Sequence, residues 1–223
     1  MPFFTDLQSR ARPVPGADAC VVVIDDDPEF RASLGRLLRS VGLRSQLFAS
    51  IADFLQSDPA DCATCLVLDV RLPGQSGLDF QRELAAANVT LPIVFITGHG
   101  DIPMSVQAMK AGAIEFLTKP FRDQDLLDAV NVGLGRDRER RENDAALSML
   151  RARFEVLTAR ERSILTQVAA GRLNKQIAGD LGITETTVKV HRSNAMRKIN
   201  AASLAELCRM LDKLKVPAEG SGS

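Results

Sequence analysis

The sequence predicts a doubly wound α/β domain with a five-stranded parallel sheet, followed by a small all-α domain. Short apolar runs alternate five times with stretches of helical periodicity over the first 130 residues, an alternation typical of a parallel sheet covered by helices on both faces. A run that is charged at every position but Asn143, residues 136–144, then interrupts this pattern. Short helical patterns alone follow from Phe154 onward, which indicates a separate helical unit.

The charge of the chain is divided unevenly between these two regions. The 223 residues carry 28 basic and 28 acidic side chains. Residues 18–125 hold 9 basic and 15 acidic side chains, whereas residues 152–215 hold 12 basic and 6 acidic ones. An acidic block suits metal or phosphate chemistry, and a basic block suits nucleic acid.

No apolar run approaches membrane-spanning length, and residues 1–16 lack the apolar core of a signal peptide. We therefore expect a cytoplasmic protein with no membrane partner. Flexible tails are expected at 1–17 and 216–223.

The elements of the first domain follow from local patterns. Phe30, Leu34 and Leu38 recur at helical spacing, and Gly42 can end that helix. Ser50 with Asp53 indicates a second helix start. Strands are expected at the five apolar runs, Cys20–Ile24, Leu43–Phe48, Cys65–Leu68, Ile93–Ile96 and Ala113–Leu117.

The charged run allows two interpretations. It is either a helical linker that extends the preceding helix, or a solvated helix end with a flexible tether. Gly133 and Gly135 weaken any continuous helix through this region.

The helical domain contains four predicted helices. Thr158 and Glu161 have the spacing of a capping box at the first. Gly182 and Ile183 predict a tight turn before the third helix. The other three helices are expected over Leu173, Ile177 and Leu181, from Thr184 as cap through about Glu185 to Ile199, and over Ser203 to Leu211.

Cys62 and Cys65 have the spacing of a redox motif. Cys65, however, opens an apolar run, so we interpret it as a small core residue and keep a redox role as the alternative.

Polar groups with phosphoryl-transfer chemistry follow several of the predicted strands: Asp25, Asp26 and Asp27 after the first, Asp69 after the third, Thr97 after the fourth and Lys119 after the fifth. Ligands of such folds bind beyond the carboxyl ends of the strands, so these groups should meet. Clustered carboxylates resist ionising together unless a cation binds, and Mg²⁺ is the natural candidate. A carboxylate nucleophile, a metal, a lysine and a hydroxyl together suit phosphoryl transfer.

The same residues resemble the receiver domains of two-component systems. Asp25-Asp26, Asp69, Thr97 and Lys119-Pro120 match the receiver pattern, and Thr97–Phe121 is similar to the FixJ subfamily in particular. The resemblance implies a flavodoxin-like receiver with a cis Lys119–Pro120 bond. It further implies that Asp69 accepts the phosphoryl group; that Asp25, Asp26, Asp69 and the backbone carbonyl of Arg71 bind Mg²⁺; and that Thr97, Phe116 and Lys119 form the switch and the phosphate contact.

Asp27 is an additional acid, which we interpret as a loop or helix N-terminal charge rather than a metal ligand. Two alternatives for the site remain. A receiver that is only structural would leave DNA binding independent of phosphorylation. An aspartate-nucleophile phosphatase would need a second acid two residues after Asp69, where Arg71 stands.

The third helix of the small domain has an unusual outer face. Val188, Ala195 and Ile199 share one side, whereas Val190 lies about 200° around the helix from Val188. An outward valine beside Lys189 suits a major groove, where cations meet phosphates or guanine and an apolar group meets a thymine methyl. An ordinary basic helix surface is the alternative.

Residues 157–199 resemble the helix-turn-helix of the LuxR/FixJ type, especially at Glu161, Asn174-Lys175 and Thr187–His191. The resemblance implies contacts to DNA bases or backbone by Asn174, Lys175, Thr187, Lys189, Val190, His191, Arg192 and Lys198. For His191, packing at the domain boundary is nearly as good an interpretation.

Together these features predict a two-component response regulator and not an enzyme. Its expected partners are a sensor histidine kinase, double-stranded promoter DNA and a second copy of the chain once phosphorylated, with RNA polymerase as a further candidate. The expected domains are a receiver at 18–135, a charged helical linker at 136–153 and a DNA-binding domain at 154–215.

Overall fold

The computed structural model describes residues 19–58, 62–98 and 102–216. The chain divides into two compact units, Met1–Asn143 and Asp144–Ser223. The tails expected at 1–17 and 216–223 lie outside the described residues, except for Val216, which packs against the core of the second unit.

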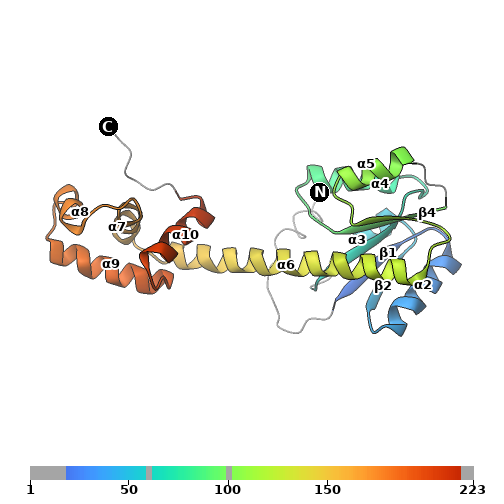
Figure 1. Ribbon diagram of the computed structural model, residues 1–223, viewed down its shortest axis with the longest axis horizontal. Helices are drawn as coiled ribbons and strands as arrows, with labels where there is room; N and C mark the ends of the chain where they lie inside the picture. Colours follow the sequence, from blue (N-terminus) through green and yellow to red (C-terminus); the bar gives the residue numbers. More distant parts are fainter. Residues whose placement is uncertain (1–18, 59–61, 99–101, 217–223) are drawn as a thin grey trace. The chain divides into compact units, whose positions relative to one another are not determined.

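The first unit contains the predicted parallel sheet (Figure 1). It has five strands in the order β2-β1-β3-β4-β5. Its strands are β1 (Cys20–Ile24), β2 (Arg44–Phe48), β3 (Thr64–Asp69), β4 (Ile93–Thr97) and β5 (Glu115–Thr118). Every residue of β1, β3 and β4 is buried, as expected for central parallel strands covered on both faces. The doubly wound fold class is therefore confirmed.

Each face of the sheet carries its own hydrophobic core. One joins residues such as Leu66 and Phe95 to α3, α4 and α5, and the other joins Val67 and Ile96 to α2 and α6. Figure 1 shows α4 and α5 on one side of the strands and α2 and α6 on the other. Their bounds are Pro28–Ser40 for α2, Ile51–Gln56 for α3, Gly77–Ala86 for α4, Ile102–Lys110 for α5 and Asp123–Glu155 for α6.

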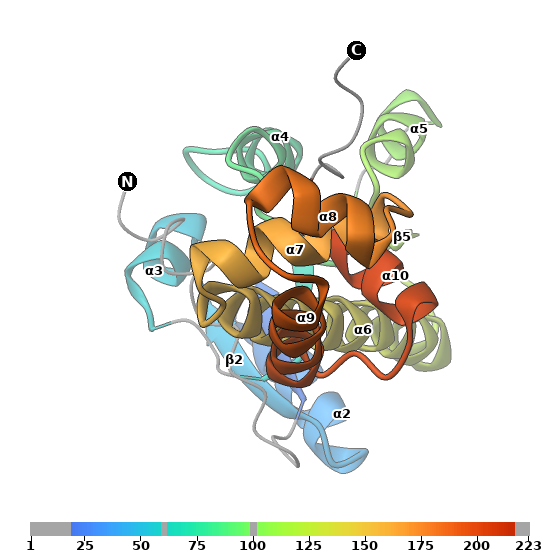
Figure 2. The ribbon, with the colours of Figure 1, turned by 90° about the vertical axis from the view of Figure 1, so that its left-hand side faces the viewer.

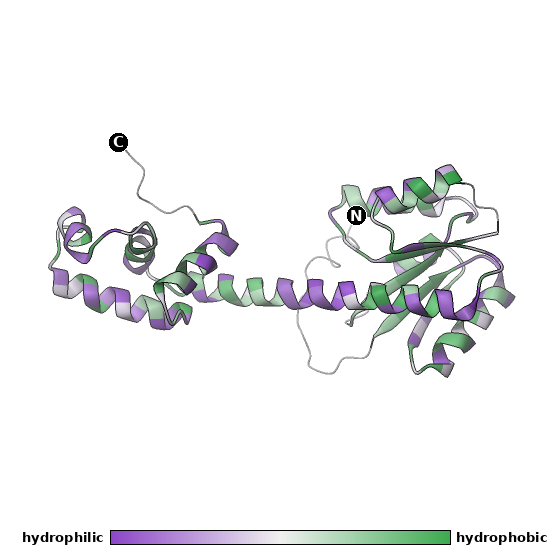
Figure 3. Cartoon of the chain, viewed as in Figure 1, coloured by the Kyte–Doolittle hydropathy of each residue, from purple (hydrophilic) through white to green (hydrophobic). Residues whose placement is uncertain are grey.

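Helix α6 runs without a break through the charged segment, which Figure 3 shows as a hydrophilic stretch in its middle. Gly133 and Gly135, which were expected to weaken a continuous helix, do not interrupt it. A Cβ on Gly133 would lie 2.5 Å from the sulfur of Cys65 and 3.3 Å from Pro92. Gly133 therefore lets α6 approach β3 closely, and packing against the sheet compensates for its low helix propensity.

Asp137, in the charged segment, is 1% exposed. Its carboxylate accepts a hydrogen bond from the backbone nitrogen of Thr64 at the start of β3 (2.9 Å) and pairs with Arg140 (2.7 Å). Sequence periodicity did not reveal this residue, because an aspartate within a charged run has the local pattern of a solvated helix face. The contact ties α6 to the sheet beyond the last apolar residue of the packed face, Leu134.

The second unit is all-helical, as predicted, with α7 (Ala159–Ala169), α8 (Asn174–Leu181), α9 (Glu185–Ile199) and α10 (Leu204–Leu214). Helices α7 and α8 both contact α9, which Figure 2 shows nearly end-on. Thr158 and Glu161 form the predicted capping box, and Gly182 has a φ of 63° at the turn before α9. Leu173, however, is not part of the apolar stripe of α8: it is the N-cap residue and is 68% exposed.

Cys65 is fully buried and unpaired. Burial raises the pKa of its thiol to about 12, so the reactive thiolate is disfavoured. This supports the interpretation of Cys65 as a core residue. No helix in the described part of the chain combines the length and the apolarity needed to cross a membrane.

Candidate functional site

The polar groups predicted at the strand ends meet at one edge of the sheet. Asp25 directly follows β1, Asp69 is the last residue of β3, Thr97 is the last residue of β4, and Lys119 follows β5. One carboxylate oxygen from each of Asp25, Asp26 and Asp69 lies within 4.8 Å of the other two. Parallel strands bring these groups together although they are up to 94 residues apart in the chain.

The ammonium of Lys119 bridges two of these carboxylates. It donates to Oδ2 of Asp25 at 2.6 Å and to Oδ2 of Asp69 at 2.7 Å. Burial raises the pKa of Asp25 despite these contacts. Burial also disfavours the charged form of Lys119, but its hydrogen bonds to Asp25 and Asp69 outweigh this effect and raise its pKa. One ammonium among three carboxylates leaves an excess of negative charge, which a divalent cation would neutralise.

Backbone groups hold the carboxylates in place. The nitrogen of Arg71 donates to Oδ1 of Asp69 (2.8 Å), and the nitrogen of Asp27 donates to Oδ1 of Asp25 (3.0 Å). A Cβ on Gly77 would lie 2.5 Å from the carbonyl oxygen of Asp69, so only glycine lets α4 begin this close to the site. Sequence reasoning missed Gly77, because a glycine at a helix start carries no local sign of such a contact.

Asp27 has the role of a helix cap. Its Oδ1 accepts hydrogen bonds from the backbone nitrogens of Glu29 (2.9 Å) and Phe30 (3.2 Å) at the start of α2. The helix N-terminal interpretation of this third aspartate is therefore confirmed, and its charge also suits the positive end of the helix dipole.

Thr97 and Phe116, expected to act as a switch pair, lie on neighbouring strands β4 and β5. Thr97 is fully buried, and its carbonyl accepts a hydrogen bond from the nitrogen of Lys119 (2.8 Å). Phe116 is partly buried, with its ring centroid 6.2 Å from that of Phe95. The Lys119–Pro120 peptide bond is cis, as expected.

The second unit presents a basic helix beside a turn. Val188, Ala195 and Ile199 of α9 are fully buried, whereas Val190 is 54% exposed. Lys189 is exposed too and pairs with Glu185 one turn earlier, at 3.3 Å. The outward direction of Val190 predicted from helix geometry is therefore confirmed.

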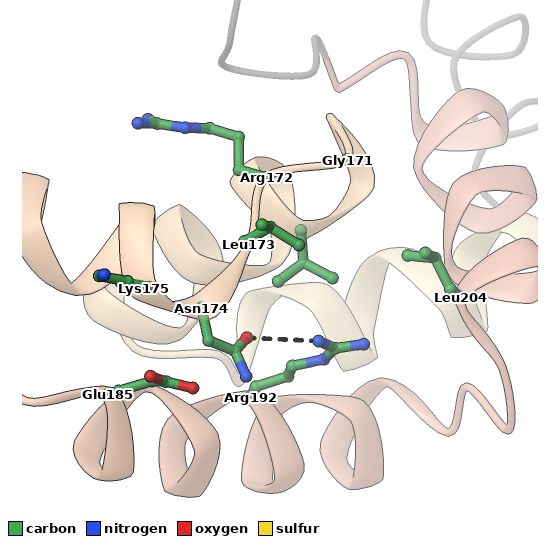
Figure 4. A pocket seen from close by; sticks show the side chains of 9 residues that line it. Gly171, Arg172, Leu173, Asn174, Lys175, Glu185, Arg192 and Leu204 are labelled. Atoms are coloured by element: carbon green, nitrogen blue, oxygen red, sulfur yellow. Dashed lines mark hydrogen bonds between the residues drawn. The ribbon is translucent and has the colours of Figure 1, made fainter.

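Several of the predicted contact residues line one hollow. Asn174 and Lys175 at the start of α8 lie opposite Arg192 of α9 (Figure 4). Nη1 of Arg192 donates to Oδ1 of Asn174 at 3.3 Å. Thr187 has a different environment, because its hydroxyl contacts that of Thr184, the cap of α9 (2.8 Å). His191 is partly buried.

Lys198 is also engaged within the fold. Its ammonium pairs with Oε2 of Glu161 at 2.7 Å, and Glu161 is 4% exposed. The same Oε2 accepts from the backbone nitrogen of Thr158 (2.9 Å). The hydrogen bond from Lys198 is the main reason why the pKa of Glu161 is lowered. This pair fastens α9 to the start of α7.

The chain matches two known families over its two units. Residues 21–131 match the response regulator receiver domain, and residues 155–211 match the luxR family of bacterial regulatory proteins. Nodulation protein W of Bradyrhizobium diazoefficiens is 54% identical over 90% of this chain and 88% of its own length. The transcriptional regulatory protein FixJ of Azorhizobium caulinodans is 46% identical over 85% of this chain and 90% of its own.

Two solved structures are similar to this chain over most of its length. The response regulator StyR has a TM-score of 0.80 at 50% identity, covering 88% of this chain and all of that one. Full-length FixJ from B. japonicum has a TM-score of 0.52 at 37% identity, covering 88% of this chain and 97% of that one. With the acidic site at the sheet edge and the basic helix beyond the turn, these similarities show that the chain belongs to the two-component response regulators of the FixJ type, which are transcription factors rather than enzymes and join a receiver domain to a LuxR-type DNA-binding domain.

Proposed function

We propose that Asp69 accepts a phosphoryl group from a phosphohistidine of a partner kinase. The observation that carries this proposal is the set of three carboxylates within 4.8 Å that shares the ammonium of Lys119. In the transfer, an oxygen of Asp69 forms the new bond to phosphorus while the bond from phosphorus to the imidazole nitrogen breaks. Lys119 then neutralises charge on the phosphoryl oxygens.

The donor set fits Mg²⁺, a hard cation that takes one or two carboxylates together with water and phosphate oxygens. We assign Asp25, Asp26, Asp69 and the backbone carbonyl of Arg71 as its ligands. When bound, the ion would neutralise the excess negative charge of the carboxylates and of the incoming phosphoryl group. The contact from the nitrogen of Arg71 to Asp69 supports this assignment, because it keeps that residue's backbone beside the site.

Thr97 and Phe116 then change position in response to the phosphoryl group. In this proposal the Thr97 hydroxyl moves toward the phosphoryl oxygens, and Phe116 turns into the space that it leaves. The contact of Phe116 with Phe95 of the core supports a path from the site to helix α5 and strand β5. That face exposes Ile102, Val106 and Met109, so the change favours pairing with a second copy of the chain.

The DNA-binding domain reads a promoter with α9. Lys189 and Val190 face base edges, because both side chains are exposed and Val190 lies on the side of α9 opposite the core. Asn174 and Lys175 lie against the DNA backbone, and Arg192 contacts bases or phosphate. Thr187 and His191 flank this surface. Lys198, whose ammonium pairs with Glu161, lies against the DNA backbone as well.

The outcome is regulation of transcription in the cytoplasm, with contact to RNA polymerase as a further step.

The phosphorylation proposal is tested by labelling with acetyl phosphate, with and without Mg²⁺. Wild-type protein should take up one phosphoryl group per chain only with Mg²⁺. Asp69→Asn, which keeps the shape of the side chain, should take up none. Labelling of the Asn variant would show that another residue is the acceptor.

The DNA proposal is tested by binding to a cognate and a scrambled duplex across a salt series. Lys189→Ala and Val190→Ala should lose about 1–3 kcal/mol of discrimination between the duplexes. Lys175→Ala should weaken binding to both duplexes and lower the salt slope by about one unit. Stable Lys189 and Val190 variants that keep the wild-type ratio would contradict the assignment of α9.

A further inference from the structure

The ammonium of Lys119 has a third partner besides the two carboxylates. It lies over the aromatic ring of Phe30, 4.0 Å from the ring centroid. The face of an aromatic ring is negative, so it attracts a cation at this distance. The receiver site therefore includes an aromatic residue from helix α2.

The position of Phe30 is fixed by hydrogen bonds that involve the aspartates of the receiver site. Its backbone nitrogen donates to Oδ1 of Asp27 (3.2 Å), and the nitrogen of Asp27 donates to Oδ1 of Asp25 (3.0 Å). Lys119 donates to the other oxygen of Asp25 (2.6 Å), which closes a ring of contacts through Phe30. The third aspartate of the sequence thus orients the residue that lies against the lysine.

A second aromatic ring supports the first from the side. Phe121 meets Phe30 edge to face, with centroids 6.0 Å apart and planes at 85°. This geometry is favourable for aromatic pairs and limits the rotation of the Phe30 ring. Phe121 is two residues after Lys119, so the same segment carries both the cation and the support of its aromatic partner.

Lysine alone is poorly suited to hold an ammonium in one place. Its stem is flexible, and the ammonium is strongly hydrated. Asp69 attracts it only while Asp69 is a free carboxylate, and phosphorylation converts that carboxylate into an acyl phosphate. The Phe30 ring, like the carboxylate of Asp25, offers an attraction that does not change with the state of Asp69.

We propose that Phe30 is a positioning residue for phosphoryl transfer: its ring keeps the Lys119 ammonium directed at the phosphoryl group before and after Asp69 is modified. This inference rests on the proposed role of Asp69 as acceptor.

The test replaces Phe30 in the full chain with phenylalanines that carry one, two or three ring fluorines. Fluorine weakens the negative ring face while nearly preserving the size of the side chain. With saturating Mg²⁺ and acetyl phosphate, the logarithm of the phosphorylation rate should fall in proportion to the loss of cation affinity of the ring. Phe30→Leu should slow phosphorylation about three- to tenfold, and Phe30→Trp should retain the wild-type rate.

A matched control places the trifluorinated residue at Phe80, which is buried in the core on the opposite face of the sheet. It should leave the rate unchanged. A flat series at position 30, in a protein whose wild type is labelled and whose Asp69→Asn variant is not, would overturn the role of Phe30 alone. Failure of the wild type to take label would overturn the role of Asp69 and that of Phe30 with it.

Discussion

Each unit of the molecule joins a lysine to a buried carboxylate at nearly the same distance. Lys119 lies 2.6 Å from Asp25 and 2.7 Å from Asp69 in the receiver, and Lys198 lies 2.7 Å from Glu161 in the DNA-binding domain. By distance alone the three lysine–carboxylate contacts cannot be told apart. Their surroundings separate a reactive centre from a structural one.

The balance of charge around each lysine makes the difference. Glu161 is a single carboxylate, satisfied by Lys198 and by the backbone nitrogen and hydroxyl of Thr158, and its pKa is lowered. The receiver centre has three carboxylates, and burial raises the pKa of Asp25. A satisfied ion pair stabilises a fold, whereas a group of carboxylates that outnumbers its cations, with Asp25 and Asp69 buried and Asp26 exposed, favours binding of a further cation.

The largest difference between the two centres is expected when each lysine is replaced in turn by methionine. Lys119→Met should slow phosphorylation of Asp69 by about 100-fold or more, because a charged donor to the developing phosphoryl oxygens is lost. Lys198→Met should leave the rate unchanged. The measurement is the initial rate of labelling by acetyl phosphate. Equal losses in the two variants would remove the proposed distinction.

The second comparison concerns stability. Glu161→Ala should lower the free energy of unfolding of the second unit by about 2–3 kcal/mol, because it removes both the capping box and the partner of Lys198. Glu185→Ala, which removes an exposed pair with Lys189, should cost less than about 0.5 kcal/mol. The chain has no Trp or Tyr, so hydrogen exchange of the α7 amides is the suitable readout. Similar losses would show that the pair with Lys198 has no structural role.

Mg²⁺ should stabilise the protein through the carboxylates of the receiver site and not through Glu161. At a tenfold excess over its dissociation constant, Mg²⁺ should stabilise the receiver by about 1.4 kcal/mol. Asp26→Asn should lose most of this gain, and Glu161→Gln should keep it. Thermal unfolding with and without Mg²⁺ measures both. An undiminished gain in the Asp26 variant would exclude that residue as a ligand.

The smallest effect should be the pH dependence of the structural pair. Because folding lowers the pKa of Glu161, its contribution to stability is fully present above the ordinary value of about 4.3. It is lost as the pH falls through the lowered pKa of the folded state. The difference in stability between wild type and Glu161→Gln should therefore be constant near neutral pH and shrink below about pH 4. A stability difference between wild type and Glu161→Gln that grows in acid would show that folding raises the pKa of Glu161.

Local patterns in the sequence were enough to predict the strands, most helices and the meeting of Asp25, Asp69 and Lys119 at one edge. Strand periodicity and helix caps are local, and parallel strands put their carboxyl ends on the same side whatever the lengths of the connections. The outward face of Val190 also followed from helix geometry alone. The sequence by itself therefore determined the fold class and the chemistry of the receiver site.

Other features depend on which surfaces meet, and only the tertiary structure decided them. Gly133 has the pattern of a helix breaker until Cys65 is seen 2.5 Å from where its Cβ would be. Lys198 has the pattern of an exposed basic helix residue until Glu161, 37 residues earlier in the chain, is found beside it. Phe30 has the pattern of an ordinary apolar helix residue until its ring is found against Lys119. Periodicity in the sequence predicts that a side chain is buried. It does not predict which residue the side chain contacts, because that residue comes from a distant segment and only the packed fold brings the two together.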